Sequence, residues 1–228
     1  MIKNNRSDDI LELVNSSGSI SVKELAERTY TSPSTVRREL QRLEEMGLLR
    51  RHHGSAQSLL TMRPPQIIRR QYNQEEKKEI ARRAAEMLTP DSTVFIDAST
   101  TVQYMIPHIA TVPGITVYTN GADTAMQLAE AKIRVVSTGG NLLPESMAYV
   151  GAVALDAVRR VHFDAMFFSS AAFDDGVVSD WSEQETALRR IVMEQSVKKY
   201  FLADRTKKGK RRTHVVCRVT EIDKIFCE

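Results

Sequence analysis

From residue 93 onward, short apolar runs alternate with longer segments of helical periodicity. The apolar runs have the length and the β-branched or aromatic content of buried strands. They are Thr93–Ile96, Thr116–Tyr118, Ile133–Ser137, Ala165–Phe168, Tyr200–Ala203 and Val215–Val219. The helical segments are Thr101–Ile109, Ala122–Ala131, Val150–Val158 and Glu185–Ser196. This alternation predicts an α/β, Rossmann-like domain built on a mostly parallel sheet.

The first 56 residues follow a different pattern, which predicts three short helices. The first covers Ser7 to Asn15, and the second opens with a capping box that runs from Ser21 to Glu24. Ser32 caps the third helix, Pro33 stands in its first turn, where no N–H is needed, and Gly47 ends it. Two helices joined by a tight turn near residue 30 are typical of a helix-turn-helix.

The third helix has a polar outward face. Val36, Leu40 and Leu43 repeat with helical spacing and predict its buried stripe. The residues left on the outer face are Ser34, Thr35, Arg37, Arg38, Gln41 and Arg42. Hydroxyls near the positive helix end suit phosphate groups, and arginines one turn further on can reach guanine edges or phosphates. The alternative is an amphipathic helix whose arginines are simply solvated.

The segment LLRRHHGSAQSL, residues 48–59, predicts a small β-wing that turns at Gly54 and Ser55. Its basic residues suit contact with a DNA backbone or minor groove, whereas the two adjacent histidines alone do not indicate a metal site. Helix and wing together predict a winged helix-turn-helix. Its predicted DNA-contacting residues are Ser32, Ser34, Thr35, Arg37, Arg38, Arg42, Arg51 and His53.

Charge and composition support this division and exclude several classes of protein. Residues 1–83 hold 16 Lys and Arg against 11 Asp and Glu, whereas residues 84–228 hold 16 against 18. A basic front part suggests a polyanionic partner for that part alone. No apolar run approaches the length of a membrane span, and the first residues lack the apolar stretch of a signal peptide. The two cysteines form no CxxC pair, which favours a reducing cytoplasm and argues against a zinc module.

The predicted organisation has two domains and a connector. The winged helix-turn-helix covers residues 1–57, the linker covers residues 58–73 and the α/β domain covers residues 74–228. The linker breaks periodicity at Pro64 and Pro65 and carries Arg63, Arg69 and Arg70, whose charges either add attraction for DNA or are solvated. A helix is predicted from Asn73 to Leu88, with Asn73 and Glu76 as its start signal.

Polar and glycine-rich segments follow several of the predicted strands. They are Asp97–Thr101, Thr119–Gly121, Thr138–Asn141 and Asp204–Gly209. Hydroxyls, backbone amides and cations at one edge of a parallel sheet suit a small phosphorylated or polyhydroxyl ligand. The pattern fits equally well the ordinary turns of any such sheet. There is no GxGxxG motif at the first turn and no P-loop, so no dinucleotide, ATP or other cofactor is expected.

The motifs extend to a family resemblance that covers nearly the whole chain. The stretch ISVKELAERTYTSPSTVRRELQRLEEMGLLRRHHGSA resembles the N-terminal signature of DeoR-type bacterial transcription regulators, with Ser55 in place of one wing glycine. IDASTTV, TNGADTAM, TGGNLLPESMAYVG, SEQETALRR and ADRTKKG resemble successive blocks of the effector domain of that family. The chain departs from the family pattern at Ser169–Ala172, at Ser182 and at Gly121.

The resemblance implies a fold and a function. The effector domain would be similar in fold to ribose-5-phosphate isomerases and would sense a phosphorylated sugar. The residues implied to line its pocket are Asp97, Ser99, Thr100, Thr101, Thr119, Asn120, Gly139, Gly140, Glu183 and Lys207. Gly121, which adjoins Asn120, is included in the predicted site. The chain would be a cytoplasmic bacterial regulator, most simply a repressor of carbohydrate genes, without a bound metal.

Three further expectations concern activity and partners. A second hypothesis is a sugar-phosphate isomerase with an added DNA-binding module, in which Asp97 or Glu183 acts with Lys207. A third is a transcriptional activator, because sequence does not encode where an operator lies. A homodimer or homotetramer is expected, since one winged helix-turn-helix reads only a few base pairs.

Overall fold

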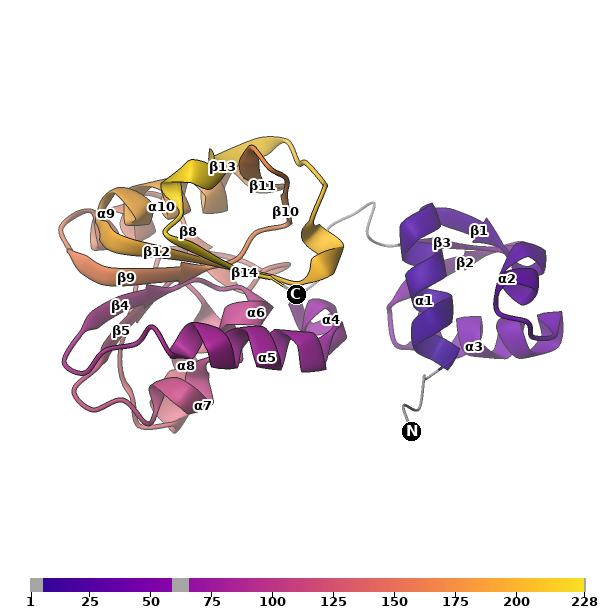
Figure 1. The fold of residues 1–228 in the computed structure, drawn as a ribbon, viewed down its shortest axis with the longest axis horizontal. Helices are drawn as coiled ribbons and strands as arrows, with labels where there is room; N and C mark the ends of the chain where they lie inside the picture. The colour runs from indigo at the N-terminus through magenta and orange to yellow at the C-terminus, as the bar shows by residue number, and fades with distance from the viewer. Residues whose placement is uncertain (1–5, 59–65, 228) are drawn as a thin grey trace. The chain divides into compact units, whose positions relative to one another are not determined.

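The structure, a computed structural model, describes residues 6–58 and 66–227. The chain divides into two compact units, residues 1–68 and residues 69–228 (Figure 1). Helix α4 (Gln66–Gln71) spans this division and lies within the segment predicted as linker. The predicted break at Pro64 and Pro65, and Arg63, lie outside the described residues.

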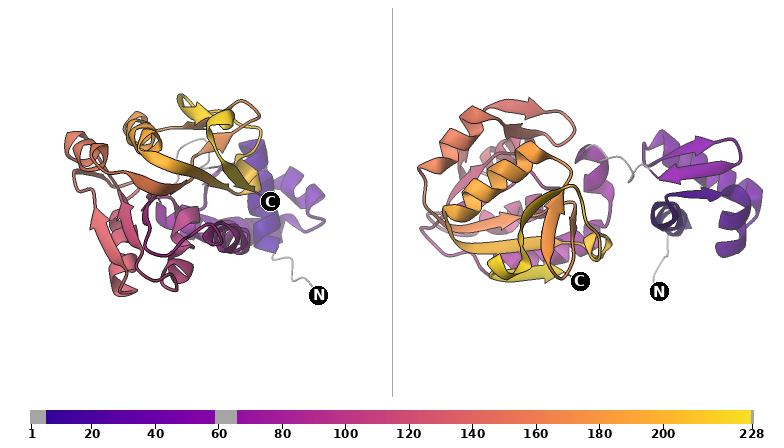
Figure 2. Two further views of the ribbon diagram at one scale, coloured as in Figure 1. Left: turned by 60° about the vertical axis from the view of Figure 1, so that its left-hand side comes forward. Right: turned by 90° about the horizontal axis from the view of Figure 1, so that it is seen from above.

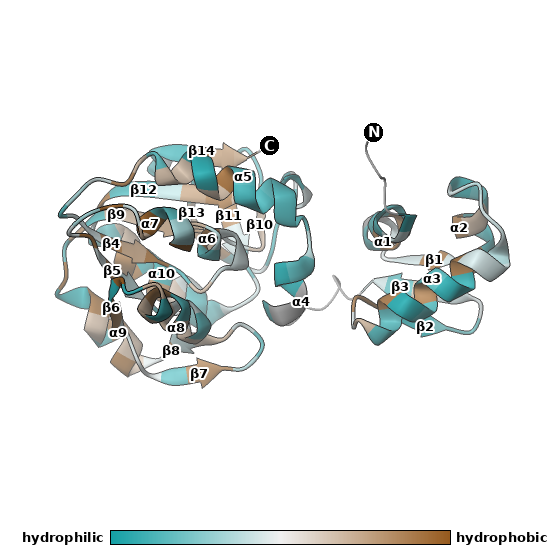
Figure 3. Ribbon diagram, turned by 90° about the horizontal axis from the view of Figure 1, so that it is seen from below, coloured by the Kyte–Doolittle hydropathy of each residue, from teal (hydrophilic) through white to brown (hydrophobic). Residues whose placement is uncertain are grey.

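The N-terminal unit contains three helices and a three-stranded antiparallel sheet. Its helices are α1 (Arg6–Ser17), α2 (Val22–Arg28) and α3 (Pro33–Glu45), and its strands are β1 (Ser19–Ser21), β2 (Leu49–His52) and β3 (Ser55–Ser58). β3 lies between β1 and β2. The predicted stripe Val36, Leu40 and Leu43 is fully buried, and Figure 3 shows hydrophilic and hydrophobic residues alternating along α3. The predicted winged helix-turn-helix is confirmed, with β1 as an additional strand.

The second unit is built on a six-stranded parallel sheet. In spatial order the strands are β14 (Lys224–Cys227), β12 (Ser196–Ala203), β9 (Phe163–Phe168), β4 (Thr93–Ile96), β5 (Thr116–Thr119) and β6 (Arg134–Ser137). Every neighbouring pair is parallel. The predicted Rossmann-like fold class is confirmed, and the carboxyl ends of all six strands share one edge of the sheet.

One predicted strand of this sheet belongs elsewhere. β13 (His214–Arg218), predicted as Val215–Val219, pairs antiparallel with β11 (Val177–Asp180), which also pairs with β10 (Ala172–Phe173). The sixth strand of the parallel sheet is instead β14, which follows β13 along the chain. Both are short and apolar, so their composition does not tell which of them joins the main sheet.

Helices cover both faces of the parallel sheet (Figures 1 and 2). One face packs against α5 (Gln74–Ala85), α6 (Thr100–Gln103), α7 (Ile106–Ile109) and α8 (Ala122–Glu130). The other packs against α9 (Ala152–Arg159), α10 (Glu183–Glu194) and the small antiparallel sheet. The helix predicted as Thr101–Ile109 is thus two short helices. α5 begins directly after Asn73, as predicted, although Asn73 has a left-handed φ of 49° and its side chain makes no capping hydrogen bond.

Candidate functional site

The exposed face of α3 presents unpaired cations beside a cluster of hydroxyls. Ser32 caps the helix by accepting a hydrogen bond from the Thr35 amide at 3.2 Å. Its Oγ also lies 2.8 Å from Ser34 Oγ and 2.9 Å from Thr35 Oγ1. The guanidinium groups of Arg37, Arg38 and Arg42 are exposed. In the described part of the chain none of the three forms an ion pair, so α3 offers free cations one turn beyond its capped end.

The wing is fastened to α3 through Arg51. Its backbone amide donates to Glu44 Oε1 at 2.8 Å and its Nε donates to Glu44 Oε2 at 2.7 Å. These bonds, the backbone one first, lower the pKa of Glu44 below its ordinary value. His53 is exposed beside Gly54, whose φ of 74° makes the turn between β2 and β3. Arg51 therefore positions the wing, and a contact from it to DNA would have to compete with Glu44.

In the second unit, the loop after β4 is buried at the strand-end edge. Asp97 Oδ1 accepts from the Ser99 amide at 3.1 Å, and Oδ2 accepts from the Ser169 amide at 3.3 Å. Ser99 caps α6 by accepting from the Val102 amide at 3.4 Å. Thr100 and Thr101 are buried, and Thr101 Oγ1 has no hydrogen-bond partner among the described residues. A buried hydroxyl of this kind suits a ligand.

The loop after β5 packs directly against the loop after β4. A Cβ on Gly121 would lie 2.5 Å from Thr124 Oγ1 and 3.0 Å from Ala98 Cα, so glycine allows the close approach. Thr119 Oγ1 accepts from the Gly121 amide at 3.0 Å, and Asn120 Nδ2 donates to the Tyr149 carbonyl at 3.2 Å. Asn120 Oδ1 is buried and, in the described part of the chain, accepts no hydrogen bond. The segments that follow β4 and β5 thus each hold a buried oxygen that, among the described residues, has no hydrogen-bond partner.

The glycines after β6 lead into a hairpin that borders these loops. The hairpin consists of β7 (Asn141–Leu143) and β8 (Ala148–Val150), and the Tyr149 amide donates to the Asn120 carbonyl at 2.6 Å. Gly139 and Gly140 have φ values of 60° and 111°. A Cβ on Gly140 would lie 2.6 Å from the Val150 carbonyl. These two glycines therefore shape the turn into the hairpin, which closes one side of the site.

Lys207 brings a cation to the same edge. It lies in the 3₁₀ turn Arg205–Lys207 after β12, and its Nζ donates to Ser169 Oγ at 2.7 Å. The carboxylate of Asp204 lies 3.8 Å from this Nζ. Burial lowers the pKa of Lys207 below its ordinary value. Lys207 is therefore linked through Ser169 to Asp97 in the loop after β4.

A second lysine at this edge was not among the predicted site residues. Lys77, on α5, is buried, and its Nζ donates to the Arg69 carbonyl and lies 3.5 Å from Thr100 Oγ1. Burial and the charge of Lys207 lower the pKa of Lys77 to about 7. Its spacing from Ile80 and Ala84, which are buried on the same face of α5, is the sequence signal that could have revealed it.

We expect Lys77→Met to remove a pH dependence of stability. The pKa of Lys77 falls from 10.5 to about 7 on folding, so between these values the unfolded chain binds a proton that the folded chain lacks. The contribution of Lys77 to the free energy of unfolding is therefore fully present above pH 10.5 and is lost as the pH falls to 7. The free energy of unfolding of the wild type, measured with urea, should rise by about 1.4 kcal/mol more per pH unit than that of the variant. Lys78→Met, next to it and exposed, is the control. Equal slopes for wild type and Lys77→Met would contradict the assignment.

A buried arginine, also absent from the predicted set, holds the strand-end acids together. Arg189, on α10, donates from Nε to Asp97 Oδ2 and from Nη1 to Asp180 Oδ2, both at 3.0 Å. Glu185 Oε1 lies 4.0 Å from its Nη2. Burial opposes the charged form, but Asp180 and Asp97 keep the pKa of Arg189 above its ordinary value. The network joins the ends of β4 and β11 to α10.

Glu183, predicted to line the pocket, is the first residue of α10 and is exposed. Glu185, two residues later, is buried and faces Arg189. The helix thus directs the second acid of the SEQE sequence, and not the first, into the strand-end network.

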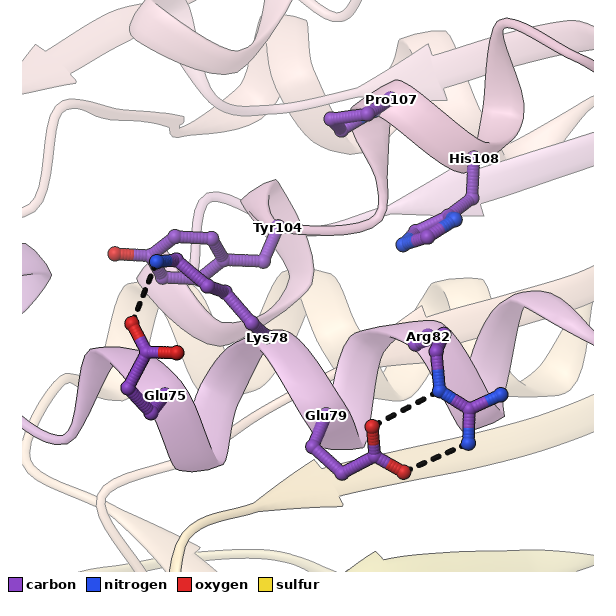
Figure 4. A pocket seen from close by; sticks show the side chains of 7 residues that line it. All are labelled: Glu75, Lys78, Glu79, Arg82, Tyr104, Pro107 and His108. Carbon is purple, nitrogen blue, oxygen red and sulfur yellow. Dashed lines mark hydrogen bonds and ion pairs between the residues drawn. The ribbon is translucent and has the colours of Figure 1, made fainter. Parts of the chain in front are cut away.

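A surface hollow of about 460 Å³ lies away from this edge (Figure 4). It lies between α5 and α7 and is lined by Glu75, Lys78, Glu79, Arg82, Tyr104, Pro107 and His108. Its charged groups are already matched, because Lys78 pairs with Glu75 at 2.6 Å and Arg82 pairs with Glu79 at 2.7 Å. None of its lining residues comes from the strand-end loops. We therefore place the candidate site at the sheet edge, where buried polar groups converge.

Two other kinds of site are not found in residues 6–58 and 66–227. No group of three or more His, Cys, Asp or Glu residues there is arranged to hold a metal ion. No helix in this part of the chain has the length and apolar character needed to cross a membrane.

Both parts of the chain match known protein domains. Residues 6–61 match the DeoR-like helix-turn-helix domain, and residues 72–228 match the DeoR C-terminal sensor domain. The lactose phosphotransferase system repressor of Staphylococcus aureus is 32% identical over 234 residues, covering 100% of this chain and 93% of the relative. The HTH-type transcriptional regulator YulB of Bacillus subtilis is 31% identical, covering 100% and 90%.

Among solved structures, a D-ribose-5-phosphate isomerase in complex with phospho-erythronic acid has a TM-score of 0.46 and 15% identity. The likeness covers 59% of this chain and 54% of the isomerase, and at this level it carries no argument about activity. The two domain matches and the full-length relatives are decisive: the chain belongs to the DeoR family of transcriptional regulators.

Proposed function

We propose that this protein represses carbohydrate genes in the bacterial cytoplasm and is released from operator DNA by a phosphorylated sugar. One observation supports a phosphorylated sugar as the ligand. Two unpartnered oxygens, Thr101 Oγ1 and Asn120 Oδ1, lie at the same sheet edge as two lysines, Lys77 and Lys207. Oxygen acceptors suit sugar hydroxyls, and ammonium groups suit a phosphate. The S. aureus relative is a lactose phosphotransferase system repressor, which supports the same class of ligand.

The DNA half of the proposal rests on α3 and the wing. Arg37, Arg38 and Arg42 are exposed without ion pairs in the described part of the chain, which suits the recognition helix of a helix-turn-helix. The hydroxyls of Ser32, Ser34 and Thr35 suit the phosphate backbone, and His53 at the wing tip suits the same role. A homodimer or homotetramer would place two such helices on a two-fold symmetric operator.

A thermal-shift screen of the full chain tests the ligand. The panel contains galactose 6-phosphate, glucose 6-phosphate, fructose 6-phosphate and ribose 5-phosphate, with the unphosphorylated sugars as controls. A phosphosugar at about one hundred times its dissociation constant adds about 2.7 kcal/mol to the stability of the sensor unit, which raises its melting temperature by several degrees. Lys207→Met should abolish the shift, because it removes a cation from the site, whereas Lys208→Met, exposed beside it, should not. A panel that leaves the melting temperature unchanged, or binds equally to Lys207→Met, would refute the assigned site.

The isomerase hypothesis is less well supported by the geometry. A general base needs an oxygen within reach of a substrate proton. Both carboxylate oxygens of Asp97 already accept hydrogen bonds, from the amides of Ser99 and Ser169 and from Arg189, and Glu183 is exposed. We therefore propose a sensor without turnover, and conversion of any panel member by the purified protein would reverse that choice.

A further inference from the structure

The segment that connects the two units ends against the candidate sensor site. Arg70, in the last turn of α4, donates from Nη2 to Gln103 Oε1 at 2.8 Å and forms an ion pair with Asp123. The hydroxyl of Tyr104 donates to the Arg70 carbonyl at 3.1 Å. Three contacts from three side chains thus hold one residue of the connector.

The two acceptors of Arg70 lie in α6 and α8, the helices that follow β4 and β5, close in sequence to the two unpartnered oxygens. Gln103 ends α6, two residues after Thr101, and Asp123 lies in the first turn of α8, three residues after Asn120. Gln103 Nε2 also donates to Thr124 Oγ1 at 2.9 Å, which ties α6 to α8. One guanidinium therefore bridges the same pair of segments that a ligand at Thr101 and Asn120 would bridge.

The residues that follow Arg70 are fastened to the remaining parts of the site. Lys77 Nζ donates to the Arg69 carbonyl and lies beside Thr100. Asn73 Nδ2 donates to Asp204 Oδ1 at 3.3 Å, and Asp204 lies three residues before Lys207. The Arg70 ion pair is polar and partly exposed to solvent, since the Arg70 side chain is 39% exposed and that of Asp123 is 29% exposed, whereas Lys77 and Asp204 are buried. Such contacts can be made or broken without opening an apolar core.

We propose that Arg70 couples the sensor site to the DNA-binding unit, an inference that rests on the proposed function. A ligand that bridges the loops after β4 and β5 fixes Gln103 relative to Asp123. The two acceptors of Arg70 are then held in place together, and the end of α4 is fastened to the sensor unit. Because α4 spans the division between the two units along the chain, ligand binding in this way restricts the connector and alters operator affinity. By reciprocity, operator binding alters ligand affinity by the same factor.

The test compares full-length wild type with Arg70→Met, and uses the tightest-binding member of the phosphosugar panel as the probe. In the wild type the probe should slow hydrogen exchange of the backbone amides of residues 69–73 and change operator affinity by about 5- to 150-fold. Arg70→Met should bind the probe within about threefold of the wild type, because Arg70 does not supply the proposed ligand contacts. Its amides at residues 69–73 should show no slowing, and its operator affinity should be the same with and without the probe.

Two further variants control for loss of structure. Asp123→Asn removes the ion pair and leaves the Gln103 bond, so it should keep part of the response. Arg82→Met removes a comparably exposed, ion-paired arginine of α5 and should keep all of it. An Arg70→Met protein whose operator affinity still responds fully to the probe would overturn the inference while leaving the proposed function intact. The inference would also be overturned if the wild type bound a panel member without slower hydrogen exchange at residues 69–73. A wild type that binds no phosphosugar would overturn both the inference and the proposed function.

Discussion

Replacing Arg189 by methionine is expected to lower the free energy of unfolding of the sensor unit by about 3–5 kcal/mol. The side chain is buried, and its guanidinium is the ion-pair partner of both Asp97 and Asp180. Without it, two buried carboxylates at the ends of β4 and β11 would lose their compensating charge. Breaking one side of a buried charge network costs more than the network contributes overall, because the remaining charges stay desolvated.

Urea unfolding of the full chain, with one probe in each unit, measures this effect. The sensor-unit transition should move to lower urea and that of the N-terminal unit should not. Arg159→Met is the matched control, because Arg159 pairs with Asp156 on the surface of α9 and its loss should change stability by less than about 1 kcal/mol. Adding Asp97→Asn to Arg189→Met should recover part of the loss. Similar stability losses for the Arg189 and Arg159 variants would mean that the buried network does not hold the strand ends together.

The second large effect is expected at α3. Arg38→Ala should weaken operator binding by about 10- to 100-fold, the cost of losing one bidentate base contact. Arg37→Ala should weaken binding to all sequences alike and reduce the slope of log affinity against log salt by about 1, as loss of a phosphate contact does. Both guanidinium groups are exposed, so neither change should alter the stability of the unit.

Fluorescence anisotropy with an operator selected from random duplexes, and with an unrelated duplex, separates the two roles across a range of salt concentrations. Arg28→Ala, which removes an exposed arginine paired with Glu24 on α2, is the control and should leave both affinities unchanged. The thermal shift produced by a phosphosugar should be the same in all these variants. An Arg38→Ala protein with wild-type operator affinity would exclude that side chain from base recognition.

The N-terminal unit could be predicted closely because its signals are local. Ser21 and Ser32 accept hydrogen bonds from amides three residues later, as the capping patterns imply. The buried stripe of α3 follows from the spacing of Val36, Leu40 and Leu43 alone. The ladder between β2 and β3 follows from the turn at Gly54. None of these features depends on a distant part of the chain.

The sensor site could be predicted only in part, because its remaining groups are brought together by tertiary contacts. Loops after parallel strands necessarily share an edge, and for that reason Asp97, Asn120 and Lys207 were predicted together. Arg189 and Lys77 lie on helices. The spacing of Lys77 from Ile80 and Ala84 places it on the buried face of α5, but it does not show that the ammonium group reaches the strand-end edge. The i, i+4 spacing of Glu185 and Arg189 was visible, but surface helices show the same spacing.

The assignment of β13 to the parallel sheet was wrong for a related reason, and β14 was not predicted. Both are short apolar strands, and the choice between the parallel sheet and the antiparallel one depends on which neighbour each strand meets after folding. Residues 177–180 supply an antiparallel partner for β13, which leaves the last edge of the main sheet to Lys224–Cys227. No property of either strand alone encodes that outcome.

The two buried oxygens of Thr101 and Asn120 also bear on the lifetime of the protein in a cell. A buried acceptor without a hydrogen bond costs about 1–3 kcal/mol, a sizeable share of the 5–15 kcal/mol by which a typical domain is stable. A ligand that satisfies both oxygens would lower the population of open states from which proteases degrade a domain. Supply of that ligand would then set the amount of regulator in the cell as well as its occupancy of DNA, and the two responses would act in opposite directions on repression.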